Sequence, residues 1–406
     1  MAGNGRRNNE YFFLNQRSEI IDCPTLTATV SQVTFQGENP TQTPSNSLHL
    51  LATEGQTPLR FWLVVPTYNP GLAEWAQWLQ ALQHQDCQPD HLVVVDSGST
   101  DGSLALSEQA ANVANAANAN ANANANATNT ASPQNPVTPQ VTLLHVQAAQ
   151  FDHGGTRQWA LNQALQAHPH KLPHVVVFMT QDAVLAQADA LRKLVQAFQN
   201  PQVAAAYGRQ LPKPQATWLE AQFRLFNYPE ASRTVQLQDK ASLGLKTCFF
   251  SNAFGAYRLT ALQAQGGLPA GLPLGEDTFM AAKLLLSGQS LQYQAQAAVY
   301  HSHHYNGQQD FQRMFDTGVF HAQNPWLLQS FGQAEGEGWR LVRHQWTQLQ
   351  LHAQRGMAEG LKGLFQMVFT NAVKLCGYKL GQWHRLWPRA LNKRFSMYKS
   401  FWRQQA

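Results

Sequence analysis

Short, continuously apolar runs alternate with amphipathic stretches through the first half of the chain. Four such runs precede the polar segment at residue 180: 61–65, 91–95, 141–146 and 174–179. After the first run, large apolar residues recur at spacings of three and four: Leu72, Trp75, Leu79 and Leu82. This spacing predicts a helix, and the unbroken runs predict buried strands. Strands without polar alternation, separated by helices, predict a mostly parallel α/β sheet covered by helices on both faces.

The composition of the chain suggests three segments. Residues 1–58 are polar and turn-rich, and we expect an N-terminal extension with little core of its own. Residues 59–310 carry the α/β pattern, interrupted at about 110–139 by a stretch of alanine and asparagine without large apolar side chains. Such a stretch buries little, so we expect a disordered insertion. Residues 311–406 are expected to be a helical C-terminal segment.

Basic residues gather in this last segment. The chain carries a net charge of +5, yet from Arg355 onward there are ten Lys and Arg residues and one acid, Glu359, so the preceding part is net acidic. The cations are mixed with Trp, Phe, Leu and Met, a pattern typical of a helix lying at a membrane surface. A packed helical subdomain is an alternative explanation. Nucleic-acid binding is a weaker one, because no nucleic-acid fold motif accompanies the segment.

Several features of the sequence favour a cytoplasmic location on the inner face of the plasma membrane. No run reaches the roughly 18–20 apolar residues that a membrane-spanning helix requires. The start shows two arginines but no apolar stretch typical of a signal peptide. The four cysteines lie far apart, without the spacing of a disulfide framework or a zinc site.

Polar side chains follow each of the four predicted strands. They include Pro66, Thr67 and Asn69 after the first run, Asp96 and Asp101 after the second, "FDHGGTR" after the third, and Thr180, Gln181 and Asp182 after the fourth. A single aspartate at a strand end usually caps a helix. In a parallel sheet, however, the carboxyl ends of the strands share one edge, where ligands bind. The sequence therefore predicts a ligand site at this edge.

At these positions the chain resembles a known enzyme family. "VVPTYNP" and "VVVDSGSTDGS" are similar to the opening motifs of family 2 glycosyltransferases, which have the Rossmann-like GT-A fold and bind a nucleotide-sugar. "FDHGGTR", "FMTQDA", "FFSNAFGAYR", "GEDTFMAAKLL", "HSHHY", "FDTGVF" and "NKRFSMYKSFW" resemble the rhamnosyltransferase branch. The resemblance extends from Phe61 to Trp402, apart from the Ala/Asn stretch.

The resemblance implies a divalent cation, Mg²⁺ or Mn²⁺, at the end of the fourth strand. Family members generally have Asp-x-Asp there, whereas this chain has Thr180, Gln181 and Asp182, in the "TQDA" form of the branch. It implies that Asp182 and His301 are metal ligands and that Thr180, Gln181 and His303 contact the donor. Alternation in an extended segment puts His301 and His303 on one face. A structural role for the histidines stays open, and a zinc site would need further nitrogen or sulfur ligands.

Glu276 and Asp277 stand where a helix is expected to begin. Acids are favoured in a first helical turn by the helix dipole alone. The resemblance implies more: Asp277 is the general base that accepts the proton of the acceptor hydroxyl, and Glu276 supports it. We expect the neighbouring acid to raise the pKa of Asp277. The implied reaction is a single displacement with inversion.

The resemblance also implies a donor site. Asp96 is expected to contact the nucleobase, with Pro66, Thr67 and Asn69 beside it. In "FDHGGTR", Gly154 and Gly155 permit close backbone approach and Arg157 is a cation suited to a phosphate.

The donor implied is dTDP-rhamnose, and the acceptor is a hydroxyl of a lipid-linked or cell-surface glycan. Two alternatives are kept. The first is a GT-A transferase that uses another nucleotide hexose or deoxyhexose. The second is a non-catalytic nucleotide-sugar-binding protein, in which the missing first acid marks lost catalysis.

Overall fold

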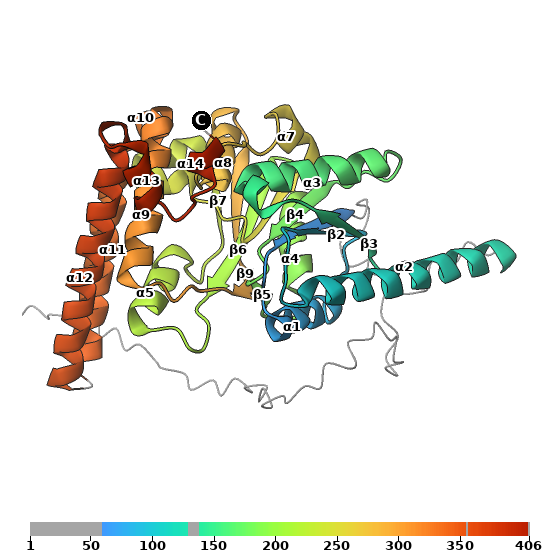
Figure 1. Cartoon of the computed structure of the whole chain (residues 1–406), viewed down its shortest axis with the longest axis horizontal. Coiled ribbons are helices and arrows are strands. Elements are labelled where there is room, and N and C mark those ends of the chain that lie inside the picture. Colours follow the sequence, from blue (N-terminus) through green and yellow to red (C-terminus); the bar gives the residue numbers. More distant parts are fainter. Residues whose placement is uncertain (1–58, 129–137, 355, 405–406) are drawn as a thin grey trace, which may run out of the picture. The chain divides into compact units, whose positions relative to one another are not determined.

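A computed structural model describes residues 59–128, 138–354 and 356–404 of the chain. Within these residues nine strands form one sheet, in the order β3-β2-β1-β4-β8-β6-β9-β5 with β7 paired to β9 (Figure 1). The strands are β1 Phe61–Thr67, β2 His91–Asp96, β3 Gln140–His145, β4 Val175–Met179, β5 Val184–Leu185, β6 Val203–Leu211, β7 Arg233–Val235, β8 Phe254–Arg258 and β9 Ser290–Tyr300. The predicted N-terminal extension, residues 1–58, lies outside the described residues.

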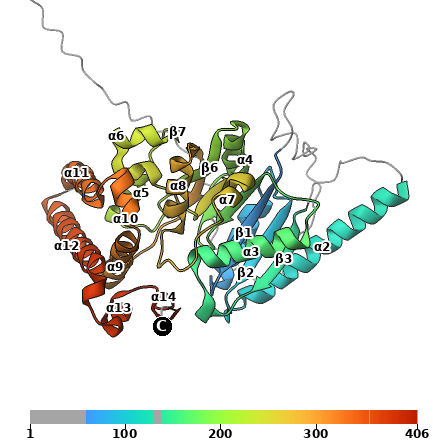
Figure 2. The same cartoon turned by 90° about the horizontal axis from the view of Figure 1, so that it is seen from above.

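The helices connect the strands in the first half and gather after β9 in the second. They are α1 Leu72–Gln83, α2 Ser103–Thr128, α3 His153–Ala167, α4 Ala190–Gln196, α5 Trp218–Asn227, α6 Lys240–Leu243, α7 Leu259–Ala264, α8 Glu276–Leu286, α9 Gly307–Gln323, α10 Pro325–Phe331, α11 Ala334–Ala353, α12 Met357–Gln382, α13 Arg389–Phe395 and α14 Phe401–Gln404. In Figures 1 and 2, α3 covers one face of strands β1 to β3, while α1 and α2 lie on the other.

The first half of the sheet is parallel, as the apolar runs predict. Strands β3, β2, β1 and β4 pair in parallel, and their valine and leucine side chains are mostly buried. The second half is mixed, because β8 runs antiparallel to both β4 and β6, while β6 and β9 are parallel. The carboxyl ends of β1, β2 and β4 therefore share one edge of the sheet, and the α/β class is confirmed.

The Ala/Asn stretch differs from its predicted disorder. Helix α2 continues through it to Thr128, and residues 129–137 lie outside the described part of the chain. The first turns are fixed by Leu106, Ala110 and Ala114, which are buried. Alanine is the best helix former, and asparagine costs well under about 1 kcal/mol per residue. A helix already nucleated by packing can therefore extend along this sequence, which the absence of large apolar residues did not reveal.

The C-terminal helices pack into the same compact unit as the sheet. Helix α12 lies against α9, and a Cβ at Gly377 or Gly381 would collide with the main chain of α9 at Phe311 or Phe315. These glycines let the two helices approach closely. Because α9 spans Gly307–Gln323, the segment boundary predicted at residue 310 falls inside this helix.

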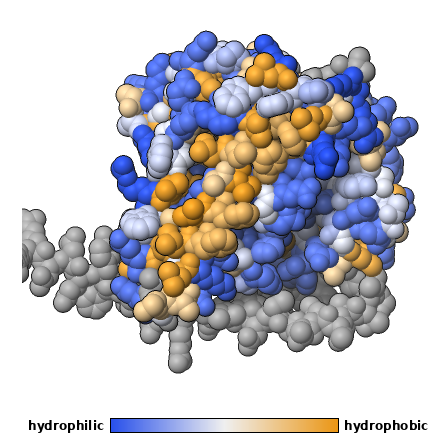
Figure 3. Space-filling model, turned by 60° about the vertical axis from the view of Figure 1, so that its left-hand side comes forward, coloured by the Kyte–Doolittle hydropathy of each residue, from blue (hydrophilic) through white to orange (hydrophobic). Residues whose placement is uncertain are grey.

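The outer side of α12 carries a stripe of exposed apolar residues. The stripe consists of Met357, Leu361, Phe365, Val368, Phe369 and Leu375, whose spacing places them along one side of the helix. Figure 3 shows an apolar band across this side of the molecule. Among the described helices, none combines the length and hydropathy needed to cross a membrane.

Candidate active site

Residues predicted to bind the nucleotide-sugar form hydrogen bonds within and between the loops after β1 and β2. The register pairs Thr67 with Asp96, and both are almost fully buried. Asp96 Oδ2 accepts hydrogen bonds from the amides of Gly98 and Ser99 at 2.8 and 3.0 Å. Asn69 has a positive φ of 43° and accepts from the Thr100 amide at 2.7 Å. Asp96 and Asn69 therefore shape this loop pair, and a contact of Asp96 with a nucleobase stays a prediction.

The loop after β4 is tied to the loop after β1 by a single side chain. Gln181 Oε1 accepts from the Tyr68 amide at 2.6 Å, and Gln181 Nε2 donates to the Tyr68 carbonyl at 3.0 Å. Its amide is therefore engaged by the main chain. The Thr180 hydroxyl lies beside the Asp182 carboxylate. Gln181 thus positions the segment that carries Asp182.

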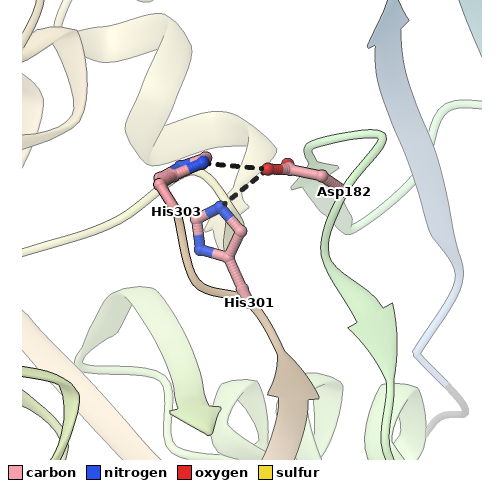
Figure 4. Close-up of side chains that lie close together, drawn as sticks. All are labelled: Asp182, His301 and His303. Atoms are coloured by element: carbon pink, nitrogen blue, oxygen red, sulfur yellow. Dashed lines mark ion pairs between the residues drawn. The ribbon is translucent and has the colours of Figure 1, made fainter. Parts of the chain in front are cut away.

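Asp182, His301 and His303 converge at the corner between β5 and β9 (Figure 4). These strands are antiparallel, with Val184 opposite Tyr300, so extending the register brings Asp182 between the two histidines. Asp182 Oδ2 lies 3.4 Å from His301 Nε2 and 3.4 Å from His303 Nδ1. The neighbouring His304 turns away toward Glu220, at 3.6 Å. The predicted alternation of the histidines is confirmed, and His303 joins a group in which only Asp182 and His301 were expected.

A hydrogen-bond network fixes the tautomer of His301. The Arg224 guanidinium donates to Gln210 Oε1, and Gln210 Nε2 donates to Ser251 Oγ at 2.8 Å. Since Gln210 Oε1 is an acceptor, His301 Nδ1 donates to it, at 2.8 Å. The His301 Nε2 lone pair then faces the Asp182 carboxylate. Two acceptors that face each other need a cation or a proton between them, and buried His301 Nε2 has no hydrogen-bond partner among the described residues.

The three side chains fit a divalent cation. Their ligand atoms all lie within 4.8 Å of one another. Ligands at right angles around an ion, with bonds of about 2.1 Å, lie about 3 Å apart, close to the observed separations. Burial lowers the pKa of His301, and it lowers that of His303 to about 3. Burial alone would raise the pKa of Asp182, but the adjacent histidines, when they carry a proton, hold it well below its usual range. Neutral imidazoles and an ionised carboxylate are the states that bind metal.

A second acidic group begins helix α8, at Glu276 and Asp277. Asp277 Oδ2 accepts from the Asn252 amide at 3.2 Å and Oδ1 from the Thr278 amide at 2.7 Å. Burial, and then the charge of Glu276, raise the pKa of Asp277 to about 7. Burial would also raise the pKa of Glu276, but Arg157 outweighs it and lowers that pKa. The expected direction for Asp277 is confirmed, and the pKa values of the two neighbouring carboxyls are shifted in opposite directions.

Arg157 is placed differently from its prediction as a phosphate ligand. Its side chain is buried and pairs with Glu276 at 3.2 Å, while it also donates to the His153 carbonyl at 2.8 Å. A Cβ on Gly154 would collide with the Pro269 carbonyl, so this glycine permits helix-to-loop packing. Gly155 donates to the capping Asp152 carboxylate at 2.5 Å. All three residues contact protein in this structure, and the donor contacts expected of Arg157, Gly154 and Gly155 stay predictions.

One chain of contacts links the two acidic groups. Gln210 bonds both His301 and Ser251, and the next residue, Asn252, donates its amide to Asp277 and its side chain to Glu276 at 3.2 Å. Asp182, His301 and Asp277 thus lie along one rim, at the edge of the sheet where the ligand site is predicted. The motif "FFSNAFGAYR" contains Asn252, so the sequence carried some signal for it. Gln210 and Arg224 were missed, because nothing in the local pattern marks a residue that acts through a distant histidine.

Comparison with known proteins identifies the family. Residues 58–315 match the model described as "Glycosyltransferase like family 2". The chain belongs to the family 2 glycosyltransferases. It is 38% identical over 342 residues to the O-antigen chain rhamnosyltransferase WbaN of Salmonella anatum, covering 84% of this chain and 95% of that protein. It is 37% identical over 344 residues to RfbN of Salmonella typhimurium, also named an O-antigen chain rhamnosyltransferase, covering 85% and 96%. The resemblance to the rhamnosyltransferase branch is confirmed.

Among solved structures, this glycosyltransferase is similar to a mannosyltransferase from Pyrobaculum calidifontis in complex with GDP-Man and Mn²⁺. The identity is 18% and the TM-score 0.48, and the alignment covers 80% of this chain and 88% of that one.

Proposed function

We propose that this glycosyltransferase moves a rhamnosyl residue from dTDP-rhamnose to a hydroxyl of a growing surface glycan, with inversion at the anomeric carbon. The observation that carries the proposal is Asp277: a carboxyl whose pKa is raised to about 7, connected through Asn252 and Gln210 to the Asp182 and His301 pair. The names of the two Salmonella relatives support the rhamnosyl donor.

In this mechanism Asp277 accepts the proton of the acceptor hydroxyl as its oxygen attacks the anomeric carbon. The new carbon–oxygen bond forms while the bond from that carbon to the diphosphate breaks, and the nucleoside diphosphate leaves. A carboxyl with a pKa near the working pH is well suited to such proton transfer. Glu276, held ionised by Arg157, keeps the Asp277 pKa high. Because the displacement is a single step, no side chain becomes covalently attached to the sugar.

Asp182, His301 and His303 are proposed to hold the divalent cation. When bound, the ion would supply charge neutralisation for the departing diphosphate. Two imidazoles in the set favour Mn²⁺ over Mg²⁺, because Mg²⁺ prefers oxygen ligands and imidazole suits later metals. Gln210 orients His301 by accepting a hydrogen bond from its Nδ1–H group, and outer contacts of this kind usually affect metal affinity.

The proposal is tested first by ligand binding. Thermal unfolding of the purified chain is measured with Mn²⁺ and with dTDP-rhamnose, UDP-glucose or GDP-mannose, since a ligand that binds only the folded state raises its Tm. We expect the largest rise with dTDP-rhamnose and Mn²⁺ together. If the Tm rose only with a different nucleotide-sugar, that nucleotide-sugar would be the donor in place of dTDP-rhamnose. No rise with any nucleotide-sugar would favour a protein without this activity.

We further propose that the acceptor is lipid-linked and that the chain lies on the inner membrane surface through the α12 stripe. The exposed fractions of Phe365 and Leu361 are 70% and 62%, large for apolar side chains on a helix. The exposed cations Arg385 and Lys393 follow this stripe in the sequence, which suits an anionic lipid surface. The stripe leaves the inner side of α12 free to pack on α9.

Vesicle binding tests this part of the proposal. The double variant Phe365→Ser/Phe369→Ser should sediment less with vesicles containing anionic phosphatidylglycerol, and added salt should weaken binding of the unmodified chain. Leu286→Ser, at an exposed leucine on α8, is the matched control and should sediment normally. Equal sedimentation of the double variant and the unmodified chain would exclude the stripe as the lipid contact. A shift from dimer to monomer in the double variant would assign it to self-association instead.

A further inference from the structure

An arginine that the sequence did not single out stands at the same rim. Arg313 lies on α9, and its side chain is exposed. No carboxylate among the described residues lies within ion-pair distance of its guanidinium. Other arginines near the site are engaged: Arg157 pairs with Glu276, and Arg224 donates to Gln210. Arg313 is therefore a cation that forms no ion pair with a carboxylate in the described structure.

A continuous stack of rings connects Arg313 to the Asp182 group. The rings of His301 and His303 meet edge to face at 4.6 Å, and His303 stacks on Tyr305 at 5.0 Å with an interplanar angle of 17°. The Arg313 guanidinium carbon lies 5.9 Å from the centre of the Tyr305 ring. A cation over an aromatic face is held there by modest attraction. Arg313 is thus presented beside the histidines that face Asp182.

The C-terminal segment supplies the other side of this arginine. The Tyr398 side chain lies beside Arg313 and interacts with it electrostatically, and the Tyr398 ring meets the His153 ring edge to face at 4.6 Å. Asp277 also acts electrostatically on Arg313. Arg313 therefore lies among groups that come from the segment after β9, from the start of α3, from the start of α8 and from the end of the chain.

Tyr398 is held in place by a buried acid on the same helix as Arg313. Asp316 is fully buried, and its Oδ2 accepts from the amides of Met397 and Tyr398 at 2.8 and 3.3 Å. Just beyond, Phe401 and Trp402 pack with Phe315 in a small apolar cluster. A buried carboxylate that bonds two main-chain amides fixes a segment strongly, because unmaking those bonds would leave the acid desolvated. The end of the chain is thereby anchored at the rim.

We propose that Arg313 binds the diphosphate of the nucleotide donor, and that the C-terminal segment, through Tyr398, positions Arg313 for this contact. The inference rests on the proposed function and extends it to residues of α9 and the chain's end. The guanidinium presents several donors in a plane that matches phosphate oxygens. An anion at this position lies beside both the Asp182 group and Asp277, where the bond to the leaving group breaks.

Calorimetric titration of dTDP in the presence of Mn²⁺ tests the proposal, with thymidine as the ligand that lacks phosphates. Arg313→Gln should weaken dTDP binding by about ten- to a hundredfold, as expected for loss of a charge-assisted contact, and leave thymidine binding unchanged. Arg313→Lys should recover part of the affinity. Tyr398→Phe should weaken dTDP binding less than Arg313→Gln, again without affecting thymidine. Arg343→Gln, at an exposed arginine on α11, is the matched control and should bind as the unmodified chain does.

The outcomes separate this inference from the proposed function. Unchanged dTDP affinity in Arg313→Gln, with a loss only in transfer to the acceptor, would overturn the inference by placing Arg313 on the acceptor side. Equal weakening of dTDP and thymidine would overturn it in favour of a structural role. If the unmodified chain binds UDP or GDP in place of dTDP, the donor assignment fails, and the same variants are titrated with that diphosphate. Thermal unfolding of each variant establishes that it is folded.

Discussion

Two aspartates at the same rim occupy opposite electrostatic environments. Asp182, at the corner between β4 and β5, faces two histidines, which hold its pKa well below the usual range despite burial. Burial, and then the charge of Glu276, raise the pKa of Asp277, at the start of α8, to about 7. Each environment suits a different chemical role, because an ionised carboxylate binds a cation, while one that titrates near neutrality exchanges protons. The residue type does not distinguish the two, but the partners do.

The largest expected effect comes from removing the base. Asp277→Asn should lower the rate of glycosyl transfer by about 10²- to 10⁴-fold, because no carboxylate is then present to take the proton of the acceptor hydroxyl. Binding of the nucleotide-sugar should persist, since Asp277 is not among the residues expected to contact it. Initial rates measure the loss of transfer, and calorimetric titration measures the affinity for the nucleotide-sugar. Glu230→Gln, at a carboxylate that is 89% exposed, is the control. Unimpaired turnover would remove Asp277 from its role.

A smaller effect is expected on the metal side of the comparison. Gln210→Leu removes the hydrogen-bond acceptor that orients His301. Loss of a residue that orients a metal ligand typically lowers metal affinity by about 10–100-fold. Activity should therefore require more Mn²⁺, with much of the rate restored at saturation. A Mn²⁺ titration of activity measures this directly. If EDTA left the activity of the unmodified enzyme intact, Asp182 and His301 would not act as ligands to a required ion.

The pH dependence should reveal how the paired acids differ. The Asp277 carboxylate must be deprotonated to accept a proton, so kcat/KM should rise as the pH increases through about 7. Glu276→Gln removes the negative charge that raises this pKa, so the rising limb should move to lower pH. A pH–rate profile of both proteins provides the comparison. An unshifted limb would mean that a group other than Asp277 controls the profile.

The smallest effect is on stability. The pKa of Asp277 is raised from 3.8 to about 7 in the folded protein. The folded state thus binds this proton more tightly than the unfolded chain, and that stabilisation is lost as the pH rises through about 7. Because asparagine stays neutral, Asp277→Asn should have a higher Tm than the unmodified chain at about pH 8, with a smaller difference at about pH 5. A difference that did not depend on pH would contradict the raised pKa.

The sequence predicted the parts of this site that depend on local pattern. Runs of valine and leucine located β1, β2 and β4, so the polar residues at their ends could be assigned to one edge. Alternation placed His301 and His303 together. That His303 also faces Asp182 depends on how β5 registers against β9, which is a pairing between distant segments. Local pattern does not determine that pairing.

Other contacts could not be predicted from the sequence, because they are tertiary. Arg157 follows two glycines, a setting typical of phosphate ligands, yet in the structure its partner is Glu276, which is distant in the sequence. Arg313 and Tyr398 lie in the segment predicted to be a membrane-associated tail, and only the packing of α9 and the chain's end brings them to the rim. The outer side of α12 kept the expected apolar and basic character, but the inner side proved to be core.

The amide of Gln181 has a consequence for how the rim responds to a ligand. Both of its hydrogen-bonding ends contact the main chain of Tyr68, so the turns after β1 and β4 cannot separate without breaking two bonds together. The two turns therefore behave as a preassembled frame rather than as independent flaps. A molecule that binds between them meets a surface already ordered by folding, and little of its affinity is lost to immobilising backbone.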